Sequence, residues 1–226
     1  MSSVSKNHCH QASTRNASTA TLKIAENDSV TRILRSAIQL FIREGGAAFS
    51  ARGVAKEAGL SLGAVQHFFR TKDQLLAAML EQVLADYAQT YEKLAEDLPF
   101  NGEARLLGAI DFLVADTWRP ETRKFFFNLY ALSCHNAFAA LRMNEVYAHH
   151  RRRIAAYIGA ARPNLSESEC FDLAMQVAAL IDGLMIYTAP GAKNVTSRKQ
   201  LSQMVKATVL RLISDHDNIH SASRRP

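Results

Sequence analysis

The sequence predicts an all-α fold of about nine helices, in which a three-helix domain near the N-terminus precedes a larger helical domain. Apolar residues recur at the 3.6-residue spacing of amphipathic helices in nearly every segment. No stretch alternates apolar and polar residues as a half-buried strand does. The 10 Gly and 5 Pro residues fall mostly between the periodic segments, where they end helices.

The first helix is expected over about 30–44, where apolar residues from Val30 to Phe41 form one stripe. Gly45 and Gly46 follow it and are typical of a helix C-terminus. The preceding residues, 1–27, are rich in Ser, Thr, Asn and Ala and lack a sustained apolar period. We therefore expect a flexible N-terminal tail before a first domain over 28–76.

Two short helices complete this first domain. Ser50 is a suitable N-cap for a helix over 51–58, and Gly59 ends that helix. Ser61 is a suitable N-cap for a second short helix over 62–68. The pair is joined by a turn of only a few residues, which predicts a helix-turn-helix motif.

Longer helices fill the second domain, expected over 77–214. Thr71 and Gln74 have the spacing of a capping box and open a helix that ends before Pro99. Further helices are expected over about 103–117, 125–132, 141–161, 167–188 and 198–213. Capping boxes that begin at Ser166 and Ser197 open the last two. The remaining residues, 215–226, are expected to form a flexible C-terminal tail.

Composition limits the possible classes of protein. The 226 residues are 48% apolar and 21% charged, which is ordinary for a globular protein and excludes fibrous and wholly disordered chains. The uncharged run 125–141 contains polar residues such as Asn128 and His135, so we expect no membrane-spanning helix. There is no apolar secretory block at the start, and three cysteines far apart predict no disulfide framework. We therefore expect a cytoplasmic protein.

The positive charge is concentrated in the first third of the chain. Of the net charge of +6, residues 28–76 carry +3, since they hold seven basic and four acidic residues. Residues 1–27 carry +2, and the remaining 150 residues carry +1. A basic first domain favours a polyanionic partner there.

The second short helix has the composition of a DNA recognition helix. The residues Leu62, Gly63 and Ala64 are short enough to approach a groove about 12 Å wide. Gln66 can pair with adenine through two hydrogen bonds, and His67 can reach a base edge or a phosphate. Arg52 and Lys72 flank the motif, where backbone phosphates would lie. The complete set of predicted DNA-binding residues is Arg52, Ser61, Leu62, Gly63, Ala64, Gln66, His67, Thr71 and Lys72.

The motif resembles the DNA-binding domain of the TetR family of transcriptional regulators. The residues that carry the resemblance are Arg32-Ile33-Leu34, Leu40-Phe41, Gly45, Ser50-Ala51-Arg52, Val54-Ala55, the run from Ala58 to Lys72, and Leu75-Leu76. The later helices, including the run Ile181-Asp182-Gly183-Leu184, are loosely similar to the choline-regulator type of this family. The sequence departs from the family at Gln66, where tyrosine is usual, and at Phe68, where His or Tyr is frequent.

The resemblance implies a homodimer that binds a palindromic operator in double-stranded DNA and leaves it when a small effector enters the C-terminal domain. It implies that Arg52 and Lys72 reach the DNA, Lys72 through a phosphate, and that the residues at 62–64 face the bases. Whether Gln66 reads a base or replaces the missing tyrosine at a phosphate remains open at this point.

The last two helices are expected to form the dimer interface. The helix over 167–188 is apolar nearly all round and must be covered on two sides, whereas the helix over 198–213 offers only one apolar stripe. Pairing both helices with their symmetry mates would cover both sides as a four-helix bundle. The alternative is that the apolar helix is simply the central helix of a monomer.

Aromatic and soft side chains in the second domain predict a pocket for a small, largely apolar ligand held by a few hydrogen bonds. Asp182 is an awkward charge on an apolar helix, and it could contact the ligand, join a polar network or pair across the dimer. The predicted ligand-binding residues are Trp118, Phe126, Tyr130, Cys134, His135, Phe138, Met143, Tyr147, His150, Met175 and Asp182. The charged run from His149 to Arg153 is expected to be a solvated helix face.

No catalytic motif, cofactor motif or convincing metal site is present in the sequence, so we expect neither an enzyme nor a bound cofactor or metal. The short run His8-Cys9-His10 and the pair His216 and His220 lack further ligands nearby. Two other functions remain as alternatives. One is a DNA-binding regulator that senses a protein or redox signal, and the other is a small helical enzyme or carrier whose basic first domain is incidental.

Overall fold

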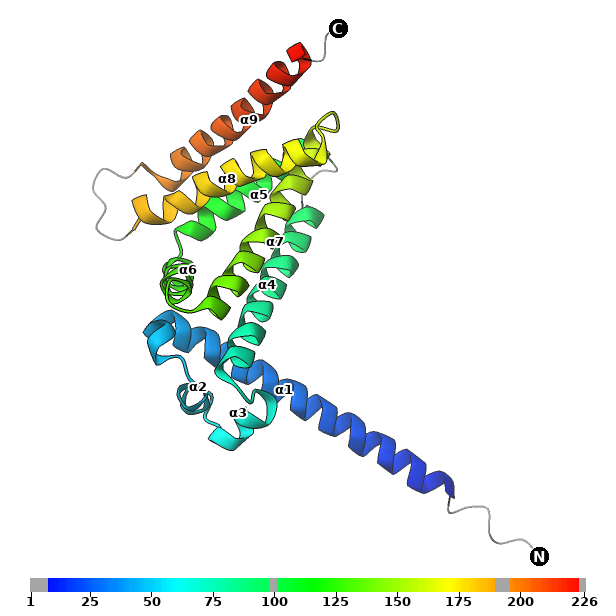
Figure 1. The fold of residues 1–226 in the computed structure, drawn as a ribbon. Coiled ribbons are helices and arrows are strands. Elements are labelled where there is room, and N and C mark those ends of the chain that lie inside the picture. The colour runs from blue at the N-terminus through cyan, green and yellow to red at the C-terminus, as the bar shows by residue number, and fades with distance from the viewer. Residues whose placement is uncertain (1–7, 98–100, 190–195, 224–226) are drawn as a thin grey trace, which may run out of the picture. The chain divides into compact units, whose positions relative to one another are not determined.

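We analysed a computed structural model, which describes residues 8–97, 101–189 and 196–223. Within these residues the regular secondary structure consists of helices alone, in agreement with the predicted all-α class. Figure 1 shows their course. In chain order the nine helices are α1 (His8–Ala48), α2 (Ala51–Ala58), α3 (Leu62–Phe68), α4 (Lys72–Asp97), α5 (Gly102–Thr117), α6 (Pro120–Ser133), α7 (Ala137–Ala161), α8 (Glu167–Tyr187) and α9 (Arg198–Ser223).

Most helix starts follow the capping residues of the sequence. The hydroxyl of Ser50 accepts from the backbone N–H of Gly53 at 3.1 Å, and the hydroxyl of Ser61 accepts from Ala64 at 3.1 Å. Ser166 and Glu169 form a full capping box at the start of α8. These bonds satisfy backbone donors that the first turn of a helix leaves free, so local sequence sets the boundaries.

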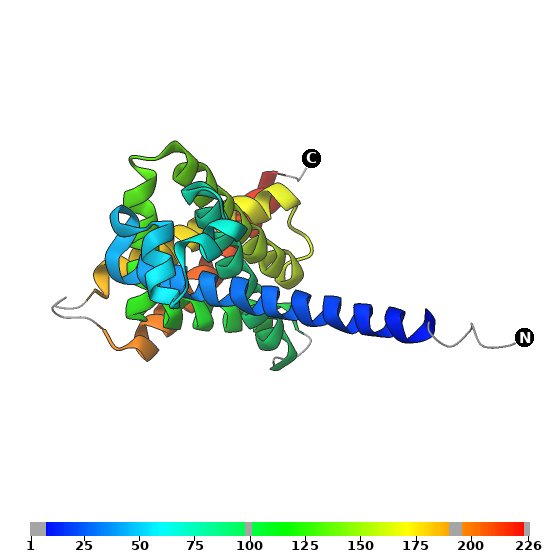
Figure 2. The same cartoon turned by 90° about the horizontal axis from the view of Figure 1, so that it is seen from below.

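The two ends of the chain differ from the prediction. Residues 8–27, expected to be a tail, form the first part of α1, which extends well past α2 and α3 in both views (Figures 1 and 2). At the other end, residues 215–223 continue α9. Neither segment contains a Gly or Pro that would break a helix, which is the physical reason for the continuation. Residues 1–7 and 224–226 lie outside the described residues.

The chain divides into two compact units, the first ending at Met79 and the second beginning at Leu80. The first unit is built from α1, α2, α3 and the start of α4. Its core is formed by buried apolar side chains from all four helices and from Phe49, whose ring stands nearly perpendicular to that of Phe41 at 5.6 Å. Val65 is the buried residue of α3.

Backbone geometry and one arginine fix the turn between α2 and α3. Gly59 ends α2 in the left-handed conformation, with φ of 61°, and its N–H donates to backbone carbonyls of that helix. Such a φ strains any residue with a Cβ atom, so glycine is needed here. The Arg32 guanidinium of α1 then donates to the carbonyls of Ala58 at 2.7 Å and Gly59 at 3.0 Å. The helix-turn-helix is thereby held against α1.

The second unit packs α5, α7, α8 and α9 around a shared core, and α7 packs most extensively against α8. Among the described residues, α8 is the one helix that is long and apolar enough to cross a membrane. However, 44% of its most apolar 18-residue stretch is buried inside the protein. Its inner face contributes Leu173, Val177 and Ile181 to the core, as in the central helix of a globular domain.

Candidate functional site

The predicted recognition helix α3 presents one face to solvent. Val65 is fully buried, whereas Gly63, Gln66 and His67 are exposed and Leu62 is half-buried. The first turn of α3 is held by the Ser61 cap, so these residues stand on a rigid, capped element. A helix that is anchored by a buried residue and has one exposed face can enter a DNA groove without unfolding its own domain.

The residues predicted to contact phosphates lie on the same unit. Arg52 on α2 is exposed, as are Thr71 and Lys72 at the start of α4. The Lys72 ammonium donates to the carbonyl of Gly46 at 3.1 Å, an exposed bond that a phosphate could replace. The Thr71 hydroxyl accepts from the backbone N–H of Gln74 at 3.1 Å, so it acts first as a helix cap.

Gly63 has no structural reason to be glycine. It has no positive φ, and a Cβ atom built at this position would meet no neighbouring atom closer than the Ser61 hydroxyl at 3.9 Å. A glycine inside a helix costs about 0.5–1 kcal/mol relative to alanine. The absence of a side chain here is the feature expected where a backbone approaches another molecule closely.

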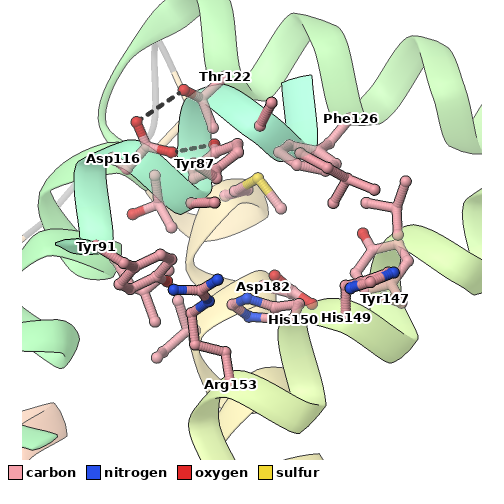
Figure 3. A pocket seen from close by; sticks show the side chains of 18 residues that line it. Tyr87, Tyr91, Asp116, Thr122, Phe126, Tyr147, His149, His150, Arg153 and Asp182 are labelled. Carbon is pink, nitrogen blue, oxygen red and sulfur yellow. Dashed lines mark hydrogen bonds between the residues drawn. The ribbon is translucent and has the colours of Figure 1, made fainter. Parts of the chain in front are cut away.

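A cavity of about 380 Å³ lies in the second unit, between side chains of α4, α5, α6, α7 and α8 (Figure 3). Four aromatic rings contribute to its wall, those of Tyr87, Tyr91, Phe126 and Tyr147. The volume lies in the range of small-molecule sites, about 300–1,000 Å³, and a mostly apolar wall with a few polar groups is typical of them.

One wall of the cavity is a hydrogen-bonded network around the buried carboxylate of Asp116. Tyr87 from α4 donates its hydroxyl to this carboxylate, and Thr122 from α6 donates to it at 3.1 Å (Figure 3). Arg119 lies 3.5 Å from the same group. Burial, followed by the charge of Asp116, raises the pKa of Tyr87 well above its usual value. The network joins three helices at the cavity wall.

The opposite part of the cavity contains titratable groups for which the described part of the chain provides no hydrogen bond. Burial lowers the pKa of His150 to about 4, so its ring is neutral near pH 7, and its Nε2 atom is buried without a hydrogen bond. Burial raises the pKa of Asp182 to about 6. Burial and then the nearby charge of Asp182 raise the pKa of Tyr147 to about 12.

The structure brings together only some of the predicted ligand-binding residues. Phe126, Tyr147, His150 and Asp182 line the cavity. Seven others do not line it, namely Trp118, Tyr130, Cys134, His135, Phe138, Met143 and Met175. Tyr130, Cys134, His135 and Met175 are exposed, because they lie on outward faces or near the C-terminal end of α6. Apolar and aromatic character alone did not distinguish the inner faces of these helices from their outer ones.

Sequence reasoning missed several cavity residues. Tyr87 and Tyr91 lie one turn apart on α4 and both line the cavity, although neither is among the predicted ligand-binding residues. The charge pattern predicts a solvated face for the run from His149 to Arg153, but His149 and Arg153 line the cavity together with the predicted His150. Of the three arginines in this run, Arg152 is exposed and the other two are half-buried. The spacing of His150 and Arg153, three residues apart on α7, was the available signal that they share a face.

Comparison with known proteins assigns the family. Residues 33–79 match the model of bacterial regulatory proteins of the tetR family, and residues 99–214, half of the chain, match the model described as BetI-type transcriptional repressor, C-terminal. The chain belongs to the TetR family of transcriptional regulators. This is a family of DNA-binding regulators rather than of enzymes, in agreement with the sequence prediction.

Individual relatives of this TetR-family chain agree with the assignment. The HTH-type transcriptional regulator PksA of Bacillus subtilis is 28% identical over 69% of this chain and 76% of its own length. The regulator BetI of Vibrio parahaemolyticus is 26% identical over 69% of this chain and 77% of its own length.

Solved structures share the fold of this TetR-family chain. A transcriptional regulator from Pseudomonas aeruginosa superposes with a TM-score of 0.71 at 18% identity, covering 84% of this chain and 92% of its own. Another regulator, from Saccharomonospora viridis and in complex with choline, superposes with a TM-score of 0.65 at 21% identity, covering 81% of this chain and 96% of its own.

Proposed function

We propose that this TetR-family regulator is a cytoplasmic homodimeric repressor that binds a palindromic operator through α3 and leaves it when a small, largely apolar molecule enters the cavity of the second unit. The observation that carries the proposal is the presentation of α3, on which Val65 is buried while Gly63, Gln66 and His67 face solvent. The effector site, the dimer and the operator are separate parts of the proposal, and each is supported by different observations.

DNA recognition is supported by the chemistry of the exposed face of α3. Gln66 offers an amide that pairs with adenine, and Gly63 lets the helix backbone approach the base edges. Arg52 and Lys72 offer positive charge on either side, which suits two phosphate contacts. Each good base contact is worth about 1–3 kcal/mol of discrimination.

The homodimer is supported by the exposed apolar side chains of the last two helices. Met175 and Ile186 of α8 are 52% and 63% exposed, and Met204 of α9 is 59% exposed. A symmetric partner would remove these side chains from water. A palindromic operator needs two copies of α3 about 34 Å apart, one DNA turn, and therefore needs a paired molecule. A solution mass of twice 25.0 kDa at micromolar concentration is expected, and a monomer would contradict this part.

Effector control is supported by α4, which carries residues of both the proposed DNA-binding surface and the cavity. Lys72 is its first residue and lies beside α3 in sequence, while Tyr87 and Tyr91, farther along the same helix, line the cavity. A ligand that contacts both tyrosines can favour one position of α4, and thereby one spacing of the two α3 helices. The choline bound to the Saccharomonospora regulator makes choline one effector to test.

The experiment is a selection of genomic DNA fragments by the full-length protein at moderate salt, followed by fluorescence anisotropy on the enriched sequence. We expect an inverted repeat, with loss of affinity when Gln66→Ala and His67→Ala are introduced. Failure to enrich any sequence would contradict the proposal. Release of the bound duplex by a compound that also raises the melting temperature would support the effector site, since a ligand at 100 times its Kd stabilises by about 2.7 kcal/mol.

A further inference from the structure

The cavity contains two opposite charges that do not pair with each other. Arg153 projects into it from α7 and Asp182 from α8 (Figure 3). Within the described part of the chain, neither side chain forms an ion pair or a hydrogen bond. The guanidinium carbon of Arg153 lies 4.8 Å from the ring centre of Tyr91, which gives it an aromatic contact but leaves its N–H donors free.

A charge withdrawn from water without a partner is costly, and the cost is relieved by an opposite charge placed beside it. Asp182 lines the same cavity as Tyr91 and Tyr147 (Figure 3), and within the described residues it accepts a hydrogen bond from neither. The oxygens of this carboxylate are therefore available to a ligand in a cavity that also has aromatic rings in its wall. A cavity that combines a carboxylate with aromatic rings suits an ammonium group, which is attracted to both.

Arg153 provides the complementary contact. Its planar guanidinium is suited to bind a carboxylate through two parallel hydrogen bonds. The neighbouring His150, one turn earlier on α7, is kept neutral by its buried position and does not compete as a cation near pH 7. The other carboxylate of the cavity, Asp116, already accepts hydrogen bonds from Tyr87 and Thr122. The cavity thus offers a ligand one carboxylate without a hydrogen bond, Asp182, and one guanidinium, Arg153, against a mostly apolar wall.

We propose that the cavity binds a small organic zwitterion, with its ammonium group at Asp182 and its carboxylate at Arg153, in preference to a simple organic cation. This inference rests on the proposed function, in which the cavity is the effector site. It deepens that function by assigning the charge pattern of the effector. A ligand with one charge alone would leave either Arg153 or Asp182 unpaired inside the cavity.

The test uses the full-length protein and a series of trimethylammonio-carboxylates with one to four methylene groups between the charges. Choline supplies the cation alone, and 3,3-dimethylbutanoate, the carbon isostere of the shortest zwitterion, supplies the anion alone. Affinities are measured by calorimetry at pH 7.5. We expect the best zwitterion to bind at least tenfold more tightly than either singly charged probe. Equal binding of choline and the best zwitterion, or binding of no member of the series, would overturn the proposal.

Variants assign the two contacts. Arg153→Gln should remove the preference for the zwitterion over choline, and Arg153→Lys should restore part of it. Asp182→Asn should weaken binding of the zwitterion and of choline alike, at least tenfold. Arg152→Gln, on the exposed face of the same helix, and Asp172→Asn, on the exposed face of α8, are the matched controls and should leave affinity unchanged. Unchanged zwitterion affinity in both Arg153→Gln and Asp182→Asn would contradict the assignment.

Release of the selected DNA duplex is measured with the same probes, which separates the two proposals. If choline releases the duplex as effectively as the best zwitterion, the charge pattern is wrong while the ligand-released regulator stands. If no DNA sequence is selected at all, the proposed function is wrong, and the calorimetric affinities still decide what the cavity binds.

Discussion

Replacing Asp182 with asparagine tests whether its carboxylate lacks a protein partner. Burial raises the pKa of Asp182 from its usual 3.8 to about 6, so the ionised form destabilises the folded protein. Each pKa unit is worth about 1.36 kcal/mol, which gives a cost of ~3 kcal/mol above pH 6. Because the side chain keeps some contact with water, we expect Asp182→Asn to raise the free energy of unfolding at pH 7.5 by about 1–3 kcal/mol.

The pH dependence makes this prediction specific. A carboxyl group whose pKa is higher in the folded state is stabilising below pH 3.8, and that contribution is lost as the pH rises through 6. The amount by which Asp182→Asn raises the free energy of unfolding should therefore be less than half as large at pH 4.5 as at pH 7.5. His150 contributes to the pH dependence of stability with the opposite sign. Its pKa falls from 6.5 to about 4 in the folded protein, so stability is lost as the pH drops. This contribution is present in both wild type and variant and is expected to cancel in their difference.

The assay is urea unfolding of wild type and variant at pH 7.5 and 4.5, without added ligand. Asp172→Asn, an exposed position on the same helix, is the control and should change stability by less than about 0.5 kcal/mol at both pH values. A variant that is less stable than wild type at pH 7.5, or whose advantage is the same at both pH values, would refute the reasoning. Either result would mean that the carboxylate is stabilised by a partner in the folded protein.

Three other substitutions test the DNA-binding unit. Gly63→Ala should stabilise the protein by about 0.5–1 kcal/mol in urea unfolding and yet weaken operator binding, because the helix has room for a methyl group and the groove does not; tighter binding would contradict this. Gly59→Ala should destabilise by about 1 kcal/mol, since φ is 61° at this position; an unchanged melting temperature would argue against the strained turn. Lys72→Ala should weaken binding to all duplexes and lower the slope of log affinity against log salt concentration by about one. Lys56→Ala, at an exposed position on α2, is the control. A loss confined to the operator would show that Lys72 does not act through a phosphate.

The sequence predicted the helices well because helix ends are set locally. Ser50, Ser61 and Ser166 each accept the backbone hydrogen bond that their position in the sequence predicts. Gly59 adopts the left-handed conformation that the turn requires. These features depend on neighbours within four residues, so no knowledge of tertiary packing was needed. The predicted bounds of α1 and α9 were too short at the outer ends, because the polar composition of residues 8–27 and 215–223 predicted tails where the structure has helix.

The cavity was predicted less well because it depends on which helix faces cover one another. Phe126 and Tyr130 lie one turn apart on α6, yet the first lines the cavity and the second is 62% exposed. Periodicity identifies a shared helix face but does not say how far along the helix the neighbouring helices cover it. For the same reason, charge pattern alone predicted a solvated face for the run from His149 to Arg153.

The central claim is that the exposed face of α3 reads DNA sequence. The most direct measurement compares the affinity of wild type and of the double variant Gln66→Ala/His67→Ala for the selected operator and for a scrambled duplex at one salt concentration. We predict that wild type prefers the operator and that the double variant loses at least about 1–3 kcal/mol on the operator, with little change on the scrambled duplex. Equal affinity of wild type for both duplexes, or an equal loss on both in the variant, would contradict the claim.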